Sequence, residues 1–467
     1  MLVALAALLG AGLLLRVYFL LVWRPALTGF SDTGVYFQGA VASLWSSPGR
    51  TAGYSMFLRV LHAISPHLIL VTIVQHGLGL LAAVLFFLAV RRCGGPRGLG
   101  LAPAAIIALG GDELFIEHAA LSEAVFIFLL SAMLYCAVRA SQDGVWWAAL
   151  AGLCAGLGVW DRVAGVEMVA VIALWLVFSA GRLTRRTIGV GALSLVVSLA
   201  SLGVYVEWRQ AASGLSGLTT NGSWALYGRV APWANCKEFK PPPGTRPLCE
   251  PTPPSQRHDH SNADYIFQYS PAQQLLGPSY LVSKYPHAMA LLQKWSEAVI
   301  LNQPLDYLHA VSLDAIRLVD PNHFSYGAYS ADELVAYLLY GPEMHPPEVN
   351  KLVTSWQRLL YPDDPAAHHG DIGPLKEWER ITRIDGVWMV ILLALCLTGP
   401  WLVAGRARAG TTLFAATALV LLFFPILTTG YDYRYTIPAF GPLLAAGALA
   451  SWGLVVRVTA RVRTARA

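Results

Sequence analysis

Charged residues are scarce in this chain of 467 residues. Lys, Arg, Asp and Glu together make up 13% of it, whereas hydrophobic residues make up 55%. A soluble globular protein carries about 25% charged residues. The shortage excludes an intrinsically disordered chain, a coiled coil, a secreted disulfide scaffold and an ordinary cytosolic enzyme. The class that remains is a membrane protein with several spans.

Long apolar runs provide the spans. A helix needs roughly 20 mostly apolar residues to cross the hydrocarbon core of a bilayer. Runs of about this length predict an all-α polytopic membrane protein with about ten transmembrane helices, although two of the runs are short. The ten runs are 1–23, 67–90, 98–112, 119–139, 144–160, 164–181, 187–208, 387–404, 410–429 and 435–456.

Acidic residues are nearly absent from one set of loops between these runs. Asp143 is the only one of the 28 acidic residues on that side, which carries thirteen arginines. Loops rich in Lys and Arg remain in the cytoplasm, so we expect both termini to be cytoplasmic in the plasma (inner) membrane. The other acids and all six lysines then lie at or beyond the outer face. The thirteen are Arg91, Arg92, Arg97, Arg139, Arg182, Arg185, Arg186, Arg406, Arg408, Arg457, Arg461, Arg463 and Arg466.

A long polar segment divides the chain into three parts. Residues 1–208 hold seven runs and a first outer loop, 24–66, whereas 387–467 hold three runs and a basic tail. The segment 209–386 is long enough for a folded, largely helical outer domain. Cys236 and Cys249 lie within it, where an oxidising exterior permits a structural disulfide.

The first outer loop carries an acid at the expected membrane surface. Ser31 and Asp32 are favourable N-cap residues, and Phe37 and Trp45 follow at a spacing typical of an interfacial helix. A second interfacial helix is predicted up to residue 64. Asp32 could act as a base between the two helices, or it could only cap the first.

Four short motifs lie on the outer side, one in the first outer loop and three at the outer ends of predicted spans. They are Ser31-Asp32-x-x-x-Tyr36-x-x-x-Ala40 with Gly53-Tyr54-x-x-Phe57-Leu58, then Leu121-Ser122-Glu123-Ala124-Val125-Phe126, then Ala151 to Arg162, and finally Tyr433-Arg434-Tyr435-Thr436-Ile437-Pro438. In order and spacing they resemble motifs of the GT-C superfamily of polytopic glycosyltransferases. That superfamily includes protein O-mannosyltransferases, the lipid A aminoarabinose transferase, and actinobacterial arabinofuranosyl- and mannosyltransferases.

The resemblance implies a glycosyltransferase of the cell envelope. Such an enzyme moves a sugar from a polyprenyl-phosphate carrier to an acceptor hydroxyl on a glycan, lipid or protein at the outer face. Asp32 then corresponds to the general base that takes the acceptor's proton. A lipid-linked sugar flippase is the alternative. Transporters, however, need charged or broken helices near the midplane, and most charges here gather at the outer ends of the runs.

Arginines near the outer face are candidates for binding the leaving polyprenyl phosphate, because a phosphate dianion needs cationic donors. They are Arg162, Arg434, Arg59 and Arg50. Each of them could instead pair with a nearby acid, as Arg434 with Asp432, or extend to the interface without a partner.

A second acidic site is predicted between the third and fourth spans, where it could approach the acceptor. Its members are Asp112, Glu113, Glu117 and His118; the alternative is a solvated turn. Glu123 lies inside the next span, where an acid is costly and usually paired, so we expect it to be structural.

Two groups of His and Asp in the outer segment resemble divalent-metal ligands in residue type. They are His258-Asp259-His260 and His368-His369-Gly370-Asp371. Both lie in stretches typical of solvated loops, so a divalent metal is an alternative that is not favoured, and the sequence identifies no certain cofactor. The sequence has no P-loop, no dinucleotide-binding motif and no basic face that suggests nucleic acid.

Overall fold

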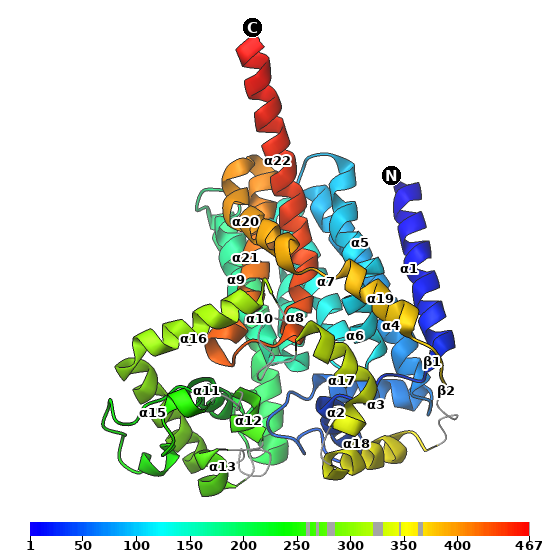
Figure 1. The fold of residues 1–467 in the computed structure, drawn as a ribbon. Helices are drawn as coiled ribbons and strands as arrows, with labels where there is room; N and C mark the ends of the chain where they lie inside the picture. The colour runs from blue at the N-terminus through cyan, green and yellow to red at the C-terminus, as the bar shows by residue number, and fades with distance from the viewer. Residues whose placement is uncertain are drawn as a thin grey trace.

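The computed structural model describes residues 1–257, 262–267, 270–277, 285–320, 330–344, 347–362 and 368–466. Helices from both ends of the chain pack into one bundle, with the two termini at the same end (Figure 1). The bundle helices are α1 (Leu2–Val22), α4 (Ile69–Arg92), α5 (Leu101–Leu109), α6 (Gly111–His118), α7 (Glu123–Gln142), α8 (Trp146–Asp161), α9 (Val166–Phe178), α10 (Arg185–Ser213), α20 (Gly386–Leu402), α21 (Gly405–Thr428) and α22 (Phe440–Arg466).

The other helices come from the first outer loop and the segment 209–386. Most of them cover the end of the bundle that lies away from the termini (Figure 1). They are α2 (Ser31–Val41), α3 (Gly53–Ile64), α11 (Gly222–Val230), α12 (Asn262–Phe267), α13 (Pro271–Leu276), α15 (Pro286–Asn302), α16 (Pro304–Arg317), α17 (Ala331–Met344), α18 (Pro347–Leu360) and α19 (Gly373–Thr382). Two short strands, β1 (Trp23–Arg24) and β2 (His368–His369), pair antiparallel.

Within the described residues, six helices are long and apolar enough to cross a membrane, among them one that runs from Tyr433 through α22. Two bent pairs would make eight: α5 with α6, bent by 47°, and α19 with α20, bent by 41°. Helices α8 and α9 have only 16 and 13 residues. The all-α membrane class is therefore confirmed for the described residues, whereas the number of ten spans stays a prediction.

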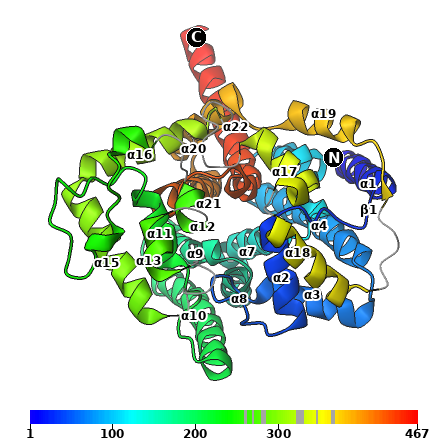
Figure 2. The same ribbon diagram turned by 60° about the horizontal axis from the view of Figure 1, so that its bottom comes forward.

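The segment 209–386 contributes to two separate cores. Helices α11, α12, α13 and α15 surround a core of their own that includes Trp224 and Trp295. The Cys236–Cys249 disulfide closes a loop of this part. Helices α17, α18 and α19 pack instead against the main core, and α18 lies beside α2 (Figure 2). Helix α18 of the predicted outer domain therefore covers α2 of the first outer loop.

A buried network of charged and polar side chains joins α1, α4 and α6. Arg16 donates from Nε and Nη2 to the two carboxylate oxygens of Glu117, at 2.7 and 2.6 Å. His76 bonds the same carboxylate at 2.9 Å through Nδ1, and its Nε2 lies 3.1 Å from Nδ1 of His118. A Cβ atom on Gly79 would lie 1.7 Å from Glu117 Oε1, so any side chain there would displace the carboxylate that Arg16 and His76 hold.

This network predicts that a single substitution lowers the free energy of unfolding more than a double substitution does. Removing one partner of a buried ion pair costs about 3–5 kcal/mol, because the other charge stays buried. Arg16→Met should therefore lower the free energy of unfolding in detergent by about this amount. Arg16→Met combined with Glu117→Gln should recover most of the loss. Equal stability of the single and double variants would contradict the assignment.

Candidate active site

Asp32 lies in the first turn of α2 and is shared by two arginines. Its Oδ1 accepts hydrogen bonds from Nε and Nη2 of Arg50, at 3.2 and 2.7 Å. Its Oδ2 accepts one from Nη2 of Arg434, at 3.0 Å. Phe30 is the N-cap of α2, and no side chain caps the helix. The interpretation of Asp32 as a helix cap is therefore wrong.

Glu123 opens α7 and brings in a third arginine. Its Oε1 forms an ion pair with Arg162 and another with Nε of Arg434, the latter at 3.2 Å. Arg434 thus bridges the two buried acids. We call Asp32, Arg50, Glu123, Arg162 and Arg434 the Asp32 cluster. Four of its members were predicted as base or phosphate ligands, and the structure brings them together around an acid that was expected to be only structural.

The charges around Asp32 determine its protonation. Burial by itself raises the pKa of this carboxyl, but the attraction of Arg50 and Arg434 outweighs burial and holds the pKa well below its usual range. Asp32 is therefore ionised at neutral pH. Asp432, whose Oδ1 accepts a hydrogen bond from the backbone N–H of Arg434, behaves differently: burial raises its pKa to about 6.

The cluster retains hydrogen-bond donors for an anion. Nη1 of Arg434 is buried and donates no hydrogen bond to any described residue. The side chain of Arg50 is 31% exposed and that of Arg162 is 12% exposed, so the cluster is reached from solvent through these two. The Arg434 guanidinium also lies 4.1 Å from the centre of the Phe30 ring. A negatively charged group could therefore approach Arg50 and Arg162 from solvent, whereas the side chain of Arg434 is 4% exposed.

The segment before α22 is held by two hydrogen bonds from residues that precede Arg434. The hydroxyl of Tyr433 donates to Oδ2 of Asp112, at 2.9 Å. The backbone N–H of Tyr431 donates to Oδ2 of Asp314, at 3.3 Å, which also accepts from Arg229. These bonds hold the backbone from which Arg434 extends toward Asp32.

Arg59 is not brought to the Asp32 cluster. Its guanidinium donates to the carbonyl oxygens of Gly39, Ala40 and Ala42, at 2.8 to 3.0 Å. These carbonyls lie at the C-terminal end of α2, where the helix offers them no partner. Arg59 therefore stabilises the end of α2, and its predicted contact with a donor phosphate finds no support in this arrangement.

The predicted second acidic site does not form one cluster. Glu117 and His118 belong to the network of Arg16, whereas Asp112 accepts from Tyr433, and Oε1 of Glu113 is buried without a hydrogen-bond partner among the described residues. All four residues are at most 5% exposed. The alternative of a solvated turn is wrong, because helix α6 is packed on all sides.

The described part of the chain contains no group of three or more His, Cys, Asp or Glu that could hold a metal ion. His258, Asp259 and His260 lie outside the described residues. His368 and His369 form β2, and the His369 ring stacks on Trp23 with 3.9 Å between ring centres.

Two hydroxyl groups at the cluster were missed as site residues, although both lie in the quoted motifs. Ser122 Oγ accepts from Arg162 Nη1 at 3.1 Å and lies 3.1 Å from the hydroxyl of Tyr36. Tyr36 follows Asp32 by four residues, a spacing that places both on one face of a helix. That spacing was the available signal for Tyr36.

No protein-family model and no curated protein matches the chain. Among solved structures, the chain is similar to the oligosaccharyltransferase of Archaeoglobus fulgidus in its apo form, with 12% identity over 99% of this chain and 52% of that one, and a TM-score of 0.44. It is similar in the same way to the archaeal oligosaccharyltransferase AglB of Archaeoglobus fulgidus in complex with an inhibitory peptide and a dolichol-phosphate, with 12% identity over the same shares and a TM-score of 0.45. The chain spans about half the length of these structures.

Loss of the hydrogen bond between Tyr433 and Asp112 should disturb the position of Arg434. Tyr433→Phe leaves the buried carboxyl of Asp112 without this donor, which typically costs about 1–3 kcal/mol. We expect a lower unfolding temperature and weaker binding of an anionic ligand at Arg434. The control Tyr18→Phe, on the exposed side of α1, should change neither. Unchanged stability and binding in Tyr433→Phe would contradict the positioning role.

Proposed function

We propose that this protein is an integral-membrane glycosyltransferase. It transfers a sugar from a polyprenyl-phosphate-linked donor to an acceptor hydroxyl on a cell-envelope glycan, lipid or protein. The observation that carries the proposal is the Asp32 cluster: one ionised carboxylate is held by two guanidiniums, and one of these retains a buried N–H without a hydrogen-bond partner among the described residues. A base and an anion site thus adjoin each other.

The phosphate of the donor is proposed to bind at Arg434, Arg50 and Arg162. Arginine is suited to this task because its planar group offers several N–H donors to phosphate oxygens. As the bond between the anomeric carbon and the phosphate oxygen breaks, negative charge grows on the leaving polyprenyl phosphate. Guanidiniums already in place stabilise that charge without having to reorganise.

Asp32 is proposed to act as the general base. It accepts the proton of the acceptor hydroxyl as the hydroxyl oxygen attacks the anomeric carbon. A carboxylate held by Arg50 and Arg434 is a weak base, because its pKa is low. A donor phosphate would compete for the same guanidiniums, and loss of their attraction would raise the pKa of Asp32. Donor binding would therefore strengthen the base.

The topology proposed for this function has ten spans, cytoplasmic termini and an outward-facing site in the plasma (inner) membrane. The positions of the arginines support it. The placement of both termini at the end of the bundle away from α2 and α11 supports it as well (Figure 1). In this proposal, residues 1–208 and 387–467 form the membrane modules, and 209–386 form the outer segment.

Asp32→Asn should abolish transfer, because the amide cannot accept the acceptor's proton, and the unfolding temperature of the variant, measured in parallel, separates this loss from a failure to fold. The assay is transfer of labelled sugar from a polyprenyl-phosphate donor in reconstituted vesicles. Asp371→Asn, an exposed acid in the outer segment, is the matched control. Retention of more than a few per cent of activity by Asp32→Asn would contradict its role as base.

Asp432 should make donor binding depend on pH. Below pH of about 6 this carboxyl is neutral, and above it the carboxyl is charged and weakens the positive field of Arg434. Lowering the pH from 7 to 5 should therefore reduce KM for the phosphodiester donor by about fivefold, which corresponds to ~1 kcal/mol. Asp432→Asn should show a low KM across this range. A variant that keeps the wild-type pH dependence would contradict the assignment.

A further inference from the structure

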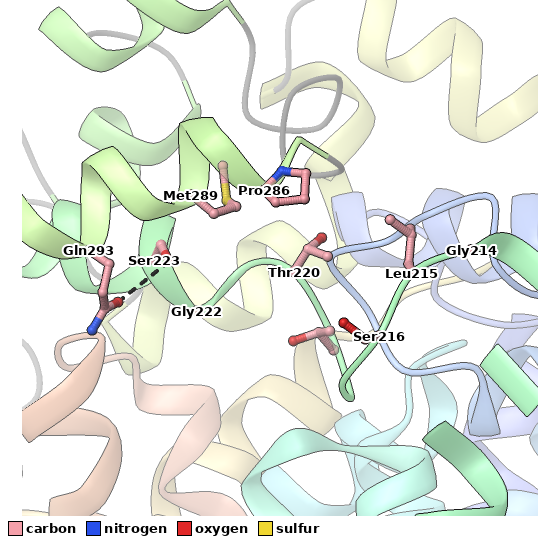
Figure 3. A pocket seen from close by; sticks show the side chains of 10 residues that line it. Gly214, Leu215, Ser216, Thr220, Gly222, Ser223, Pro286, Met289 and Gln293 are labelled. Atoms are coloured by element: carbon pink, nitrogen blue, oxygen red, sulfur yellow. Dashed lines mark hydrogen bonds between the residues drawn. The ribbon is translucent and has the colours of Figure 1, made fainter. Parts of the chain in front are cut away.

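A cavity of about 420 Å³ lies in the outer segment, where α10 ends and α11 and α15 begin. Its size falls within the range of about 300–1,000 Å³ that small-molecule sites occupy. Figure 3 shows the loop after α10 on one side and α15 on the other. None of the lining residues belongs to the Asp32 cluster. They are Gly214, Leu215, Ser216, Thr219, Thr220, Gly222, Ser223, Pro286, Met289 and Gln293.

Among the described residues, the lining is polar and carries no charge. Half of its residues bear a hydroxyl or amide group, and Ser223 donates to Oε1 of Gln293 at 3.4 Å (Figure 3). Leu215, Pro286 and Met289 add apolar surface. A neutral sugar offers both hydroxyl groups and apolar C–H faces, which match this mixture. A phosphorylated headgroup or an acidic polymer would need a cation, and the described lining residues include none.

The wall of the cavity is joined to the loop that carries Arg50. Arg209, which is 1% exposed, donates to the carbonyl oxygens of Ser216 and Gly217, each at 2.9 Å, and to that of Pro48 at 3.2 Å. Thr220 donates to the same Pro48 carbonyl from its backbone N–H at 2.9 Å and from its hydroxyl at 3.1 Å. Two residues after Pro48, the side chain of Arg50 holds Asp32.

We propose that this cavity binds the neutral glycan part of the acceptor. The inference rests on the proposed function, because it places the acceptor beside the loop that presents Arg50 to the reacting centre. A glycan bound there would extend over that loop toward Asp32. The acceptor class is then a neutral oligosaccharide rather than a peptide or an anionic lipid.

The test measures binding to the full chain in lipid nanodiscs, without a donor. The neutral probes are mannohexaose and arabinohexaose, and the comparison probes are hexagalacturonate and a hexapeptide of Ser and Thr. We expect at least one neutral probe to bind and the comparison probes not to bind.

Gln293→Ala should weaken binding about tenfold, because it removes hydrogen bonds to the probe. Ser216→Trp should fill the cavity and abolish binding. Gln274→Ala, an exposed amide on α13 outside the cavity, is the matched control and should bind like the wild type.

The proposal is overturned if neither neutral probe binds, if hexagalacturonate or the peptide binds instead, or if Gln293→Ala and Ser216→Trp bind like the wild type. Gln293→Ala keeps the test valid if Ser216→Trp fails to fold. Binding without a donor does not require Asp32 chemistry. Failure of the proposed function would therefore appear in the transfer assay of Asp32→Asn and not in this measurement.

Discussion

The carboxylate shared between Arg50 and Arg434 is the contact on which the rest of the site depends. An ionised acid cannot remain buried without partners, because taking it out of water costs several kcal/mol. Here the two oxygens of Asp32 are matched by guanidiniums from the first outer loop and from the segment before the last helix. The two parts of the membrane bundle, which also pack together where α22 meets α5 and α21 meets α9, are therefore joined by an ionic contact at this side chain.

Much of the surrounding structure holds those guanidiniums in place. Tyr433 and Tyr431 bond α6 and α16, so that Arg434 extends from a fixed backbone. Arg209 and Thr220 hold the carbonyl of Pro48 close to Arg50. Residues that looked like separate chemical candidates, such as Asp112, thus act on the site through another residue. Hydrogen bonds from surrounding residues thus fix the positions of the charged side chains in the Asp32 cluster.

The sequence predicted the class of fold and most of the cluster, because both depend on local signals. Asp32, Arg162 and Arg434 lie in short motifs at the ends of apolar runs, and helix length and charge asymmetry are read from single segments. The sequence could not show that Arg50 and Arg59 have different roles, because they are the same residue type and lie only nine residues apart. The packing of α3 on α2 turns Arg59 toward backbone carbonyls. The sequence also could not show which of the two acids, Glu117 or Glu123, belongs to the site. That depends on the helix break at Gly110 and on the direction of α6, which bring Glu117 to Arg16 and leave Glu123 to Arg434.

The long separation between Asp32 and Arg434, 402 residues along the chain, also has a consequence during biosynthesis. While the polypeptide is still emerging from the ribosome, Asp32 and Glu123 enter the membrane long before the arginine that bridges them exists. The growing chain therefore holds two acids without that partner until its last helix is inserted. Until then Asp32 has Arg50 as its partner and Glu123 has Arg162, and the Asp32 cluster forms as a whole only when Arg434 joins them.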